Sequence, residues 1–301
     1  MVPTAIVTTR AQVGRRLADY LILAKPRVVL MVLVTTTVGF YLGAADSPAP
    51  GPLLHTLFGT ALAAGGTLAL NQYIERERDA HMVRTRARPL PEGRLRPWEA
   101  LLVGLVLLGG GLAYLLVATN VLAAGITAAI AAVYLLAYTP LKPVTSLASL
   151  IGAVPGALPP VAGWAAARGD LGVEPVVLFA IMFLWQIPHT LAIGCLYRDD
   201  YERAGIRVLP LVDRAGPSAA THAVAHCLAL LPVALMPTIL GFAGSVYFVM
   251  ALALGLGFLV AAIRMARSGT LGSARRLLMT SLVYLPALLA TLAFDKVALL
   301  P

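Results

Sequence analysis

Charged residues and cysteines are both scarce in this chain. Aspartate, glutamate, lysine and arginine together make up 12% of its 301 residues, whereas ordinary soluble domains contain roughly 25%. The two cysteines, Cys195 and Cys227, lie inside or near apolar segments and lack the spacing of metal ligands. A single pair of this kind provides no disulfide framework. The sequence therefore excludes both an ordinary soluble domain and a disulfide-rich secreted scaffold.

Long apolar runs dominate what remains. Hydrophobic residues make up 59% of the chain, and its mean hydropathy is +0.85. A helix needs roughly 20 apolar residues to cross a hydrocarbon core about 30 Å thick, because it rises about 1.5 Å per residue. We therefore predict an all-α polytopic membrane protein, with nine transmembrane helices in a single domain over residues 1–301. The nine runs lie at about 28–45, 53–74, 98–117, 119–138, 145–165, 173–196, 217–240, 243–263 and 277–299.

The first 27 residues are mixed and polar and lack an A-x-A-like cleavage site, so they do not form a cleavable signal peptide. A mitochondrial presequence is the weaker alternative, because Arg10, Arg15 and Arg16 share this segment with a single acid, Asp19.

The positive charges indicate which side of the membrane each loop faces. The net charge of +9 is compatible with nucleic-acid binding, but the positions of the charges argue against it. If segment 1–27 is cytoplasmic, 21 of the 23 Lys and Arg residues lie on cytoplasmic segments, and only Arg168 and Lys296 lie outside. The positive-inside rule then predicts cytoplasmic loops at 75–97 and 197–216, and a C-terminus on the outer side.

The first of these loops begins within a column of polar residues, Asn71, Glu75 and Asp79. Their i, i+4, i+8 spacing places all three on one face of a helix, with about 6 Å between successive members. Two like charges at i, i+4 destabilise a helix by a few tenths of a kcal/mol, so we expect a compensating cation. Mg²⁺ fits, because it binds oxygen ligands and is commonly held by one or two carboxylates together with substrate phosphates.

The two loops share a short pattern, R-x-x-x-R-x-L-P, which begins at Arg84 and again at Arg203 and ends at Pro91 and Pro210. Acids precede it in both loops, and in the second loop they are Asp199 and Asp200. The repeat predicts two halves of one site, in which arginines bind phosphate oxygens. The alternative is that these are solvated charges that only set the topology. Topology does not require acids, which favours the site.

Longer stretches resemble the UbiA-type intramembrane prenyltransferases and, among them, the heme O synthase branch. The stretches are AKPRVVLMVLVTTTVGF at 24–40, NQYIERERDAHMVRTRARPLPEGRL at 71–95, YTPLKPVT at 138–145, GAVPGALPPVAGW at 152–164 and WQIPHTLAIGCLYRDDYERAGIRVLP at 185–210.

This resemblance implies nine helices around a central cavity, with the two loops closing its cytoplasmic side. It implies Mg²⁺-dependent transfer of the farnesyl group of farnesyl diphosphate to the 2-vinyl group of heme B, which gives heme O. It also implies a prokaryotic inner membrane as the location and a heme A synthase as a candidate protein partner.

The resemblance further implies roles for individual residues. Asn71, Glu75 and Asp79 are implied as catalytic and metal-binding residues, Asp199 and Asp200 would complete the metal site, and Lys142 would be a catalytic diphosphate partner. Where the wider family has D-x-x-x-D, this chain has Tyr197 and Tyr201, so the metal geometry of the second loop stays open. The other implied substrate-binding residues are Lys25, Arg27, Arg84, Arg88, Tyr138, His189, Arg198, Tyr201 and Arg207.

His189 follows Pro188 inside an apolar run, and an ionisable residue at that depth suggests a function. Its predicted role is axial contact with heme iron or a polar contact in the acceptor site; the alternative is a hydrogen bond to a freed carbonyl. His222 and His226, at i, i+4, are compatible with a metal or with helix–helix hydrogen bonds.

Two other functions remain open from the residues alone. One is a prenyltransferase that acts on a quinone precursor or chlorophyllide. The other is a transporter, for which interrupted helices are also expected. The concentration of charge in loops, rather than at the bilayer midplane, argues against the transporter.

Overall fold

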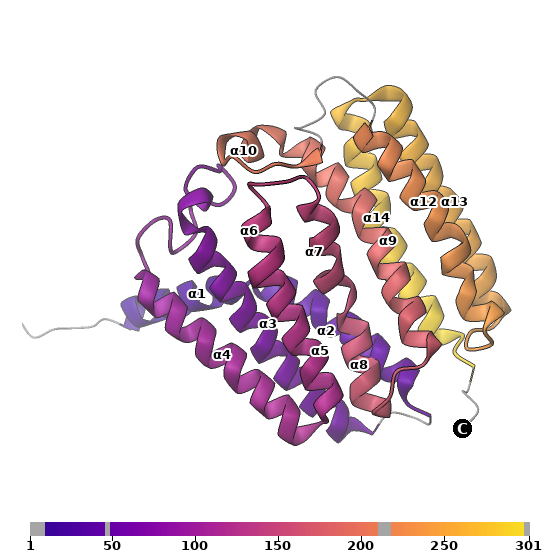
Figure 1. The fold of residues 1–301 in the computed structure, drawn as a ribbon, viewed down its shortest axis with the longest axis horizontal. Coiled ribbons are helices and arrows are strands. Elements are labelled where there is room, and N and C mark those ends of the chain that lie inside the picture. Colours follow the sequence, from indigo (N-terminus) through magenta and orange to yellow (C-terminus); the bar gives the residue numbers. More distant parts are fainter. Residues whose placement is uncertain (1–9, 46–48, 210–217, 298–301) are drawn as a thin grey trace, which may run out of the picture.

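The computed structural model describes residues 10–45, 49–209 and 218–297, and most of them are helical (Figure 1). Nine helical segments in this described part are long and apolar enough to cross a membrane. The prediction of an all-α protein with nine membrane-crossing helices is confirmed. Part of the second loop, including Pro210, falls outside the described residues.

Seven of the nine spans are single helices, and two are interrupted. The single helices are α2 (Pro26–Gly43), α3 (Pro50–Asp79), α4 (Pro97–Ala118), α9 (Val173–Leu196), α12 (Ser218–Ile239), α13 (Ser245–Ser268) and α14 (Leu271–Phe294). The interrupted spans join α5 (Val121–Ala132), the π-helix Val133–Tyr138 and α6 (Thr139–Leu141), and then α7 (Ala148–Ala157) and α8 (Pro159–Arg168). Two short helices, α1 (Arg10–Ala24) and α10 (Arg198–Arg203), lie outside the spans.

Each interruption has a local cause. The α7–α8 span breaks at Leu158, ahead of Pro159 and Pro160, because a proline has no N–H to donate and its ring clashes with the preceding turn. In the other span the Thr139 hydroxyl donates to the Tyr134 carbonyl at 2.8 Å, at the end of the π-helical turn. π-Helical turns are rare and are found frequently at functional sites.

Small residues let the helices approach closely. At Gly39 on α2, an added Cβ would overlap the carbonyl of Pro160 on α8. At Gly66 on α3, it would overlap the backbone of α4 at Gly104 and Leu108. Apolar side chains gain little from leaving lipid, so small residues and close packing stabilise helix pairs in membranes. The first contact joins α2 to α8, and the second holds α3, which carries the polar column, against α4.

Four helix boundaries differ from the prediction by five or six residues, namely the ends of α3, α13 and α14 and the start of α14. Helix α3 continues to Asp79, past the predicted end of the apolar run at 74, and it includes Glu75 and Asp79, as their spacing from Asn71 predicts. The last span begins at Leu271 rather than at 277, because the Thr270 side chain accepts a hydrogen bond from the Ser273 N–H and caps the helix. The C-terminal ends of α3 and α9 lie at one end of the bundle, together with α10 and the connection from α13 to α14 (Figure 1).

Candidate active site

The three side chains of the polar column on α3 are aligned and buried. The exposed fractions of Asn71, Glu75 and Asp79 are 1%, 7% and 1%. The Asn71 amide donates to Glu75 Oε2 at 2.9 Å, which agrees with the predicted placement of these residues on one face. Charged groups are buried in proteins only where they are paired or coordinate a metal, so this column requires partners.

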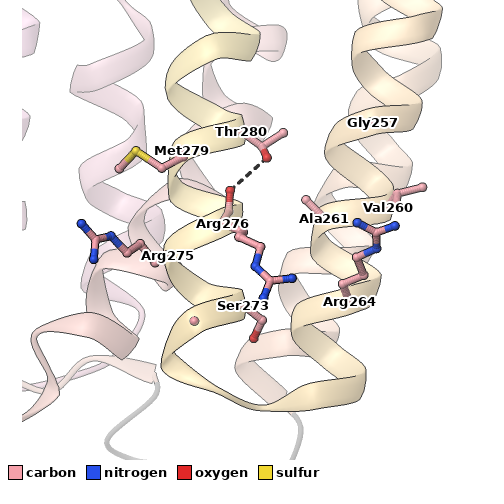
Figure 2. Close-up of a pocket in the computed structure, with 10 residues that line it drawn as sticks. Gly257, Val260, Ala261, Arg264, Ser273, Arg275, Arg276, Met279 and Thr280 are labelled. Carbon is pink, nitrogen blue, oxygen red and sulfur yellow. Dashed lines mark hydrogen bonds between the residues drawn. The ribbon is translucent and has the colours of Figure 1, made fainter.

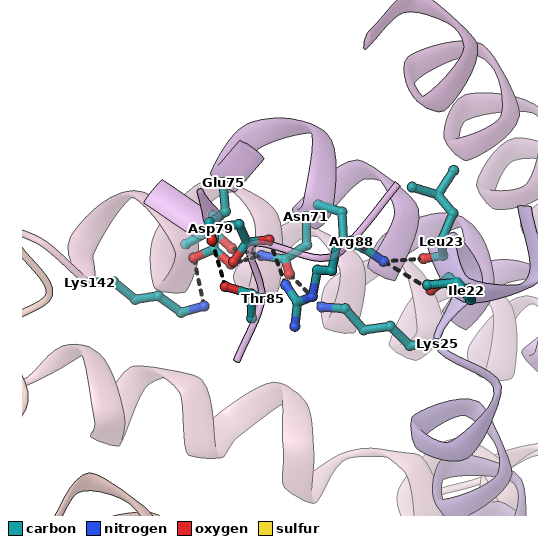
Figure 3. A network of polar contacts seen from close by, with 11 residues as sticks. Ile22, Leu23, Lys25, Asn71, Glu75, Asp79, Thr85, Arg88 and Lys142 are labelled. Carbon is teal, nitrogen blue, oxygen red and sulfur yellow. Dashed lines mark hydrogen bonds and ion pairs between the residues drawn. The ribbon is translucent and has the colours of Figure 1, made fainter. Parts of the chain in front are cut away.

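Three cations from three different segments supply those partners (Figure 3). Lys142 Nζ lies 2.7 Å from Glu75 Oε1, and Arg88 Nη1 lies 2.5 Å from Asp79 Oδ2. Lys25 Nζ donates to Asn71 Oδ1 at 3.0 Å. Three cations therefore face two carboxylates in this network, and the excess of positive charge favours an anionic ligand.

Lys25 is held in place by its backbone. It has a left-handed conformation (φ 50°, ψ 64°) and is the one described non-glycine residue with positive φ. Pro26 follows it, and a residue before proline is disfavoured in the right-handed helical region. The Gln72 amide fixes the end of α1 by donating to the carbonyls of Leu23 at 2.7 Å and Ile22 at 3.2 Å.

The two lysines differ in how firmly they hold their proton. Burial and the neighbouring Arg88 guanidinium lower the pKa of Lys25 to about 7. Burial alone would also lower the pKa of Lys142, but the neighbouring Tyr138 and Glu75 raise it above its ordinary value. Lys142 is therefore the more firmly charged, whereas Lys25 sits where positive charge is in excess.

The π-helical turn brings Thr139 and Tyr138 to this network. Thr139 Oγ1 accepts from the Asn71 amide at 3.1 Å, and Lys142 Nζ lies 4.4 Å from the centre of the Tyr138 ring. Thr139 and Gln72 were not predicted from the sequence, since their partners lie in distant segments. The only signal was their adjacency to Tyr138 and Asn71 within the quoted stretches.

Asp200 from the second loop binds the backbone of the first. Its carboxylate accepts from the N–H of Val83 at 3.2 Å and of Arg84 at 3.4 Å, and it pairs with Arg203. Burial would raise the pKa of Asp200, but the Val83 N–H and the Arg203 guanidinium hold it below its usual range. Within the described part of the chain, the contacts of Asp200 are to these groups, so its role as a metal ligand stays a prediction.

The second loop also packs on the end of α6. The Arg207 N–H donates to the Lys142 carbonyl at 2.9 Å, and its guanidinium donates to the Val144 carbonyl at 3.2 Å. Arg84 of the first loop lies over the Tyr197 ring, 5.4 Å from its centre. The two loops are thus brought together, as the repeat predicts. Of the other predicted residues, Tyr201 is half-buried, whereas Arg27, Arg198 and Asp199 are exposed at the surface.

His189 lies on α9 and contacts α14. Its ring stacks on Trp185 with 4.9 Å between centres, and its Nδ1 lies 2.8 Å from the Ser281 hydroxyl. That hydroxyl donates its single proton to the Leu278 carbonyl at 2.6 Å, so Nδ1 must be the donor toward Ser281. The neutral ring then carries its lone pair on Nε2, which can accept a hydrogen bond or bind a metal.

The donor set on α3 fits Mg²⁺. Among the described residues, no group of three or more His, Cys, Asp or Glu side chains is placed to hold a metal. Two carboxylates and an amide oxygen suit an ion that is also bound by phosphates and water.

The histidine pair on α12 makes a contact within its own helix. His226 Nδ1 bonds the His222 carbonyl at 2.7 Å, rather than a group on another helix.

Comparison with known proteins identifies a family and several relatives. The UbiA prenyltransferase family profile matches residues 32–285. The chain is 44% identical to the protoheme IX farnesyltransferase of Koribacter versatilis, over 97% of each chain. It is 45% identical to the protoheme IX farnesyltransferase of Solibacter usitatus, over 92% of this chain and 98% of the relative.

Solved structures with low sequence identity share the fold. A digeranylgeranylglyceryl phosphate synthase superposes with a TM-score of 0.77 at 17% identity, over 93% of this chain and 98% of the other. A UbiA homolog from Archaeoglobus fulgidus, bound to GPP and Mg²⁺, superposes with a TM-score of 0.69 at 17% identity, over 91% of this chain and 99% of the other.

Proposed function

Since this chain belongs to the UbiA prenyltransferase family, we propose that it transfers the farnesyl group of farnesyl diphosphate to the 2-vinyl group of heme B (protoheme IX). Membership of that family and the nine apolar helical spans among the described residues make it a membrane-embedded prenyltransferase. The identity of the two substrates is proposed from relatives that bear the name protoheme IX farnesyltransferase. The observation that carries the proposed chemistry is the buried network of two carboxylates on α3 and three cations from other segments.

The cations of this network serve the diphosphate. When the bond between farnesyl C1 and the diphosphate oxygen breaks, its electron pair stays on the diphosphate, which gains negative charge. Lys142, Arg88 and Lys25 lie within 3.0 Å of the column oxygens, and an arriving diphosphate gives them a stronger anionic partner. Fixed positive groups aimed at developing charge lower the barrier, and removing one such group typically costs about 10²–10³-fold in rate.

The oxygen atoms of the column serve the metal. Glu75, Asp79 and the Asn71 amide would hold Mg²⁺. The ion would supply Lewis-acid neutralisation of the leaving diphosphate. The protein holds these ligands ready through the Asn71–Glu75 and Asn71–Thr139 hydrogen bonds, at 2.9 and 3.1 Å.

The acceptor half of the reaction needs a hydrophobic site for a porphyrin. His189 lies seven residues before the end of α9 at Leu196, which is about 10 Å along the helix from the loop at about 1.5 Å per residue. Its free Nε2 is suited to contact heme iron or another polar group of the acceptor. The Ser281 hydrogen bond and the Trp185 stack hold the ring in that tautomer and orientation.

The proposed reaction balances with water as the third reactant. The terminal carbon of the vinyl group bonds to farnesyl C1, and the positive charge that remains on the inner vinyl carbon is captured by water, which loses a proton. The products are diphosphate and a heme that carries a hydroxyethylfarnesyl side chain, heme O. The farnesyl chain makes this product more apolar than heme B, so we propose transfer within the membrane to a heme A synthase.

The placement of the charges supports an orientation. We place segment 1–27 and both active-site loops on the cytoplasmic side of a prokaryotic inner membrane, with the C-terminus outside. Farnesyl diphosphate would then reach the site from the cytoplasm. A reporter fused after Pro301 should be found on the outer side of the membrane. A reporter found on the cytoplasmic side would contradict this orientation.

The direct test is a reaction with purified protein. Heme B, farnesyl diphosphate and Mg²⁺ are supplied in detergent, and heme O is measured by mass spectrometry. We expect heme O with the complete mixture and none when Mg²⁺ is removed by a chelator. Product formed with a quinone precursor but not with heme B would assign the acceptor differently.

A further inference from the structure

A groove at the loop end of α13 and α14 lies outside the active site. It has a volume of about 570 Å³, and the residues that line it include Gly257, Val260, Arg264, Arg276 and Met279. Figure 2 shows the Arg276 side chain between the two helices, with Arg264 on the facing side of α13. The groove opens beside the connection between Ser268 and Leu271, at the end of the bundle that also carries the active-site loops (Figure 1).

The charge of this groove has no counterpart in its own helices. The stretch 218–294 contains four arginines and no aspartate or glutamate. Among the described residues, no ion pair involves Arg264 or Arg276. Arginines of the first loop do find acids, such as Arg88 with Asp79 and Arg94 with Asp19. The groove therefore presents positive charge that the described part of the protein does not neutralise.

The groove is apolar away from its arginines. Gly257 lies seven residues before Arg264 on α13, about 10 Å farther from the loop end at about 1.5 Å per residue. Val260 and Met279 are 45% and 47% exposed, and a Cβ added at Gly257 would meet no atom within 4 Å. Such a site suits an amphiphile whose anionic group meets the arginines while its chain follows the helices into the hydrocarbon.

We propose that this groove binds an anionic phospholipid of the surrounding leaflet, with the headgroup phosphate between Arg264 and Arg276 and an acyl chain along Gly257, Val260 and Met279. Arginine is suited to phosphate because its planar group donates two parallel hydrogen bonds. Basic pockets between transmembrane helices are known to bind anionic headgroups. Topology alone requires positive charge near the loop, but it does not require the charge to flank an apolar groove.

Native mass spectrometry of the full chain in detergent tests this site. The delipidated protein is titrated with phosphatidylglycerol and, separately, with phosphatidylcholine of the same acyl chains. A basic residue near an anionic lipid contributes about 1 kcal/mol, so we expect Arg264→Gln and Arg276→Gln each to weaken phosphatidylglycerol binding about fivefold. The double variant should weaken it about thirtyfold. The matched control is Arg267→Gln, which removes the same charge from the last turn of α13 but does not line the groove.

Three results would overturn the proposal. One is equal binding of the two lipids by the wild-type protein, and another is an effect of Arg267→Gln as large as that of Arg276→Gln. The third is complete competition by inorganic phosphate at the same concentration, which would make the site one for a free anion. The melting temperature of each variant in detergent is measured alongside, and rescue of phosphatidylglycerol binding by Arg264→Lys would support the site even if Arg264→Gln unfolds.

Discussion

Replacing Asp200 with alanine separates two roles for the second loop. In the structure, the Asp200 carboxylate joins the loops by accepting from the N–H groups of Val83 and Arg84. The resemblance to the family instead implies metal binding. If the contact between the loops is the main role, Asp200→Ala loosens the first loop and leaves the affinity for Mg²⁺ unchanged.

The structure sets the size of this effect. A hydrogen bond to a charged acceptor is worth about 1.5–3 kcal/mol. The two N–H groups lie 3.2 and 3.4 Å from the carboxylate, at or beyond the usual limit of about 3.2 Å, so we take about 1.5 kcal/mol for the pair. Since about 1.4 kcal/mol corresponds to a factor of ten, the closed arrangement of the loop becomes about tenfold less favoured.

Hydrogen–deuterium exchange and kinetics measure the two consequences. We expect the amides of Val83 and Arg84 to exchange about tenfold faster in Asp200→Ala, and kcat/KM for farnesyl diphosphate to fall by up to about tenfold. Asp200→Asn should have a smaller effect, because the amide oxygen still accepts one hydrogen bond. The control is Glu77→Gln, which removes a carboxylate that is 83% exposed and pairs with Arg76.

The Mg²⁺ dependence decides between the two roles. The role in joining the loops is refuted if Asp200→Ala leaves the exchange of Val83 and Arg84 unchanged. It is also refuted if the Mg²⁺ concentration for half-maximal rate rises as much in Asp200→Ala as in Glu75→Gln. Asp200 would then be a metal ligand, as the family resemblance implies.

Three further changes test the rest of the site. Lys142→Met removes a buried cation from the diphosphate region, and we expect steady-state kinetics to show a loss of at least about 100-fold in kcat/KM; near wild-type kinetics would remove Lys142 from the site. Gln72→Leu frees the end of α1, and the shifted Lys25 should raise the KM for farnesyl diphosphate about tenfold, whereas an unchanged KM would show that Gln72 does not position it. Ser281→Ala removes the acceptor of the His189 Nδ1 proton, and we expect a higher KM for heme B with the KM for farnesyl diphosphate unchanged; equal changes in both would mean general destabilisation.

Features that repeat along the chain could be predicted from the sequence. Apolar runs of spanning length predicted all nine helices, because the thickness of a bilayer imposes their length. The i, i+4, i+8 spacing predicted the shared face of Asn71, Glu75 and Asp79, since helix geometry alone determines it. The apolar run was ended at 74 because charged residues follow it, whereas the helix continues through the buried column to Asp79.

Contacts between distant segments could not be predicted from the periodic patterns of the sequence. The partners of Gln72 lie 49 and 50 residues away, and Asn71 and Thr139 are 68 residues apart. Such contacts depend on how helices pack, which periodicity does not encode. The π-helical turn at Val133–Tyr138 is similar, because nothing in VYLLAY distinguishes it from an ordinary helix. The packing of Asp200 against the first loop likewise emerges only in three dimensions.

The network around α3 is proposed to drive farnesyl transfer to heme. The most direct test is mass spectrometry of heme extracted from cells that make heme B but no heme O, and that express either the wild-type chain or Glu75→Gln. This substitution keeps the shape of the side chain and removes its charge. With the wild-type chain we predict a heme that has gained a farnesyl group and water. With Glu75→Gln, present in the membrane in the same amount as the wild-type chain, we predict only heme B. Heme B alone in both, or equal farnesylated heme in both, would contradict the account.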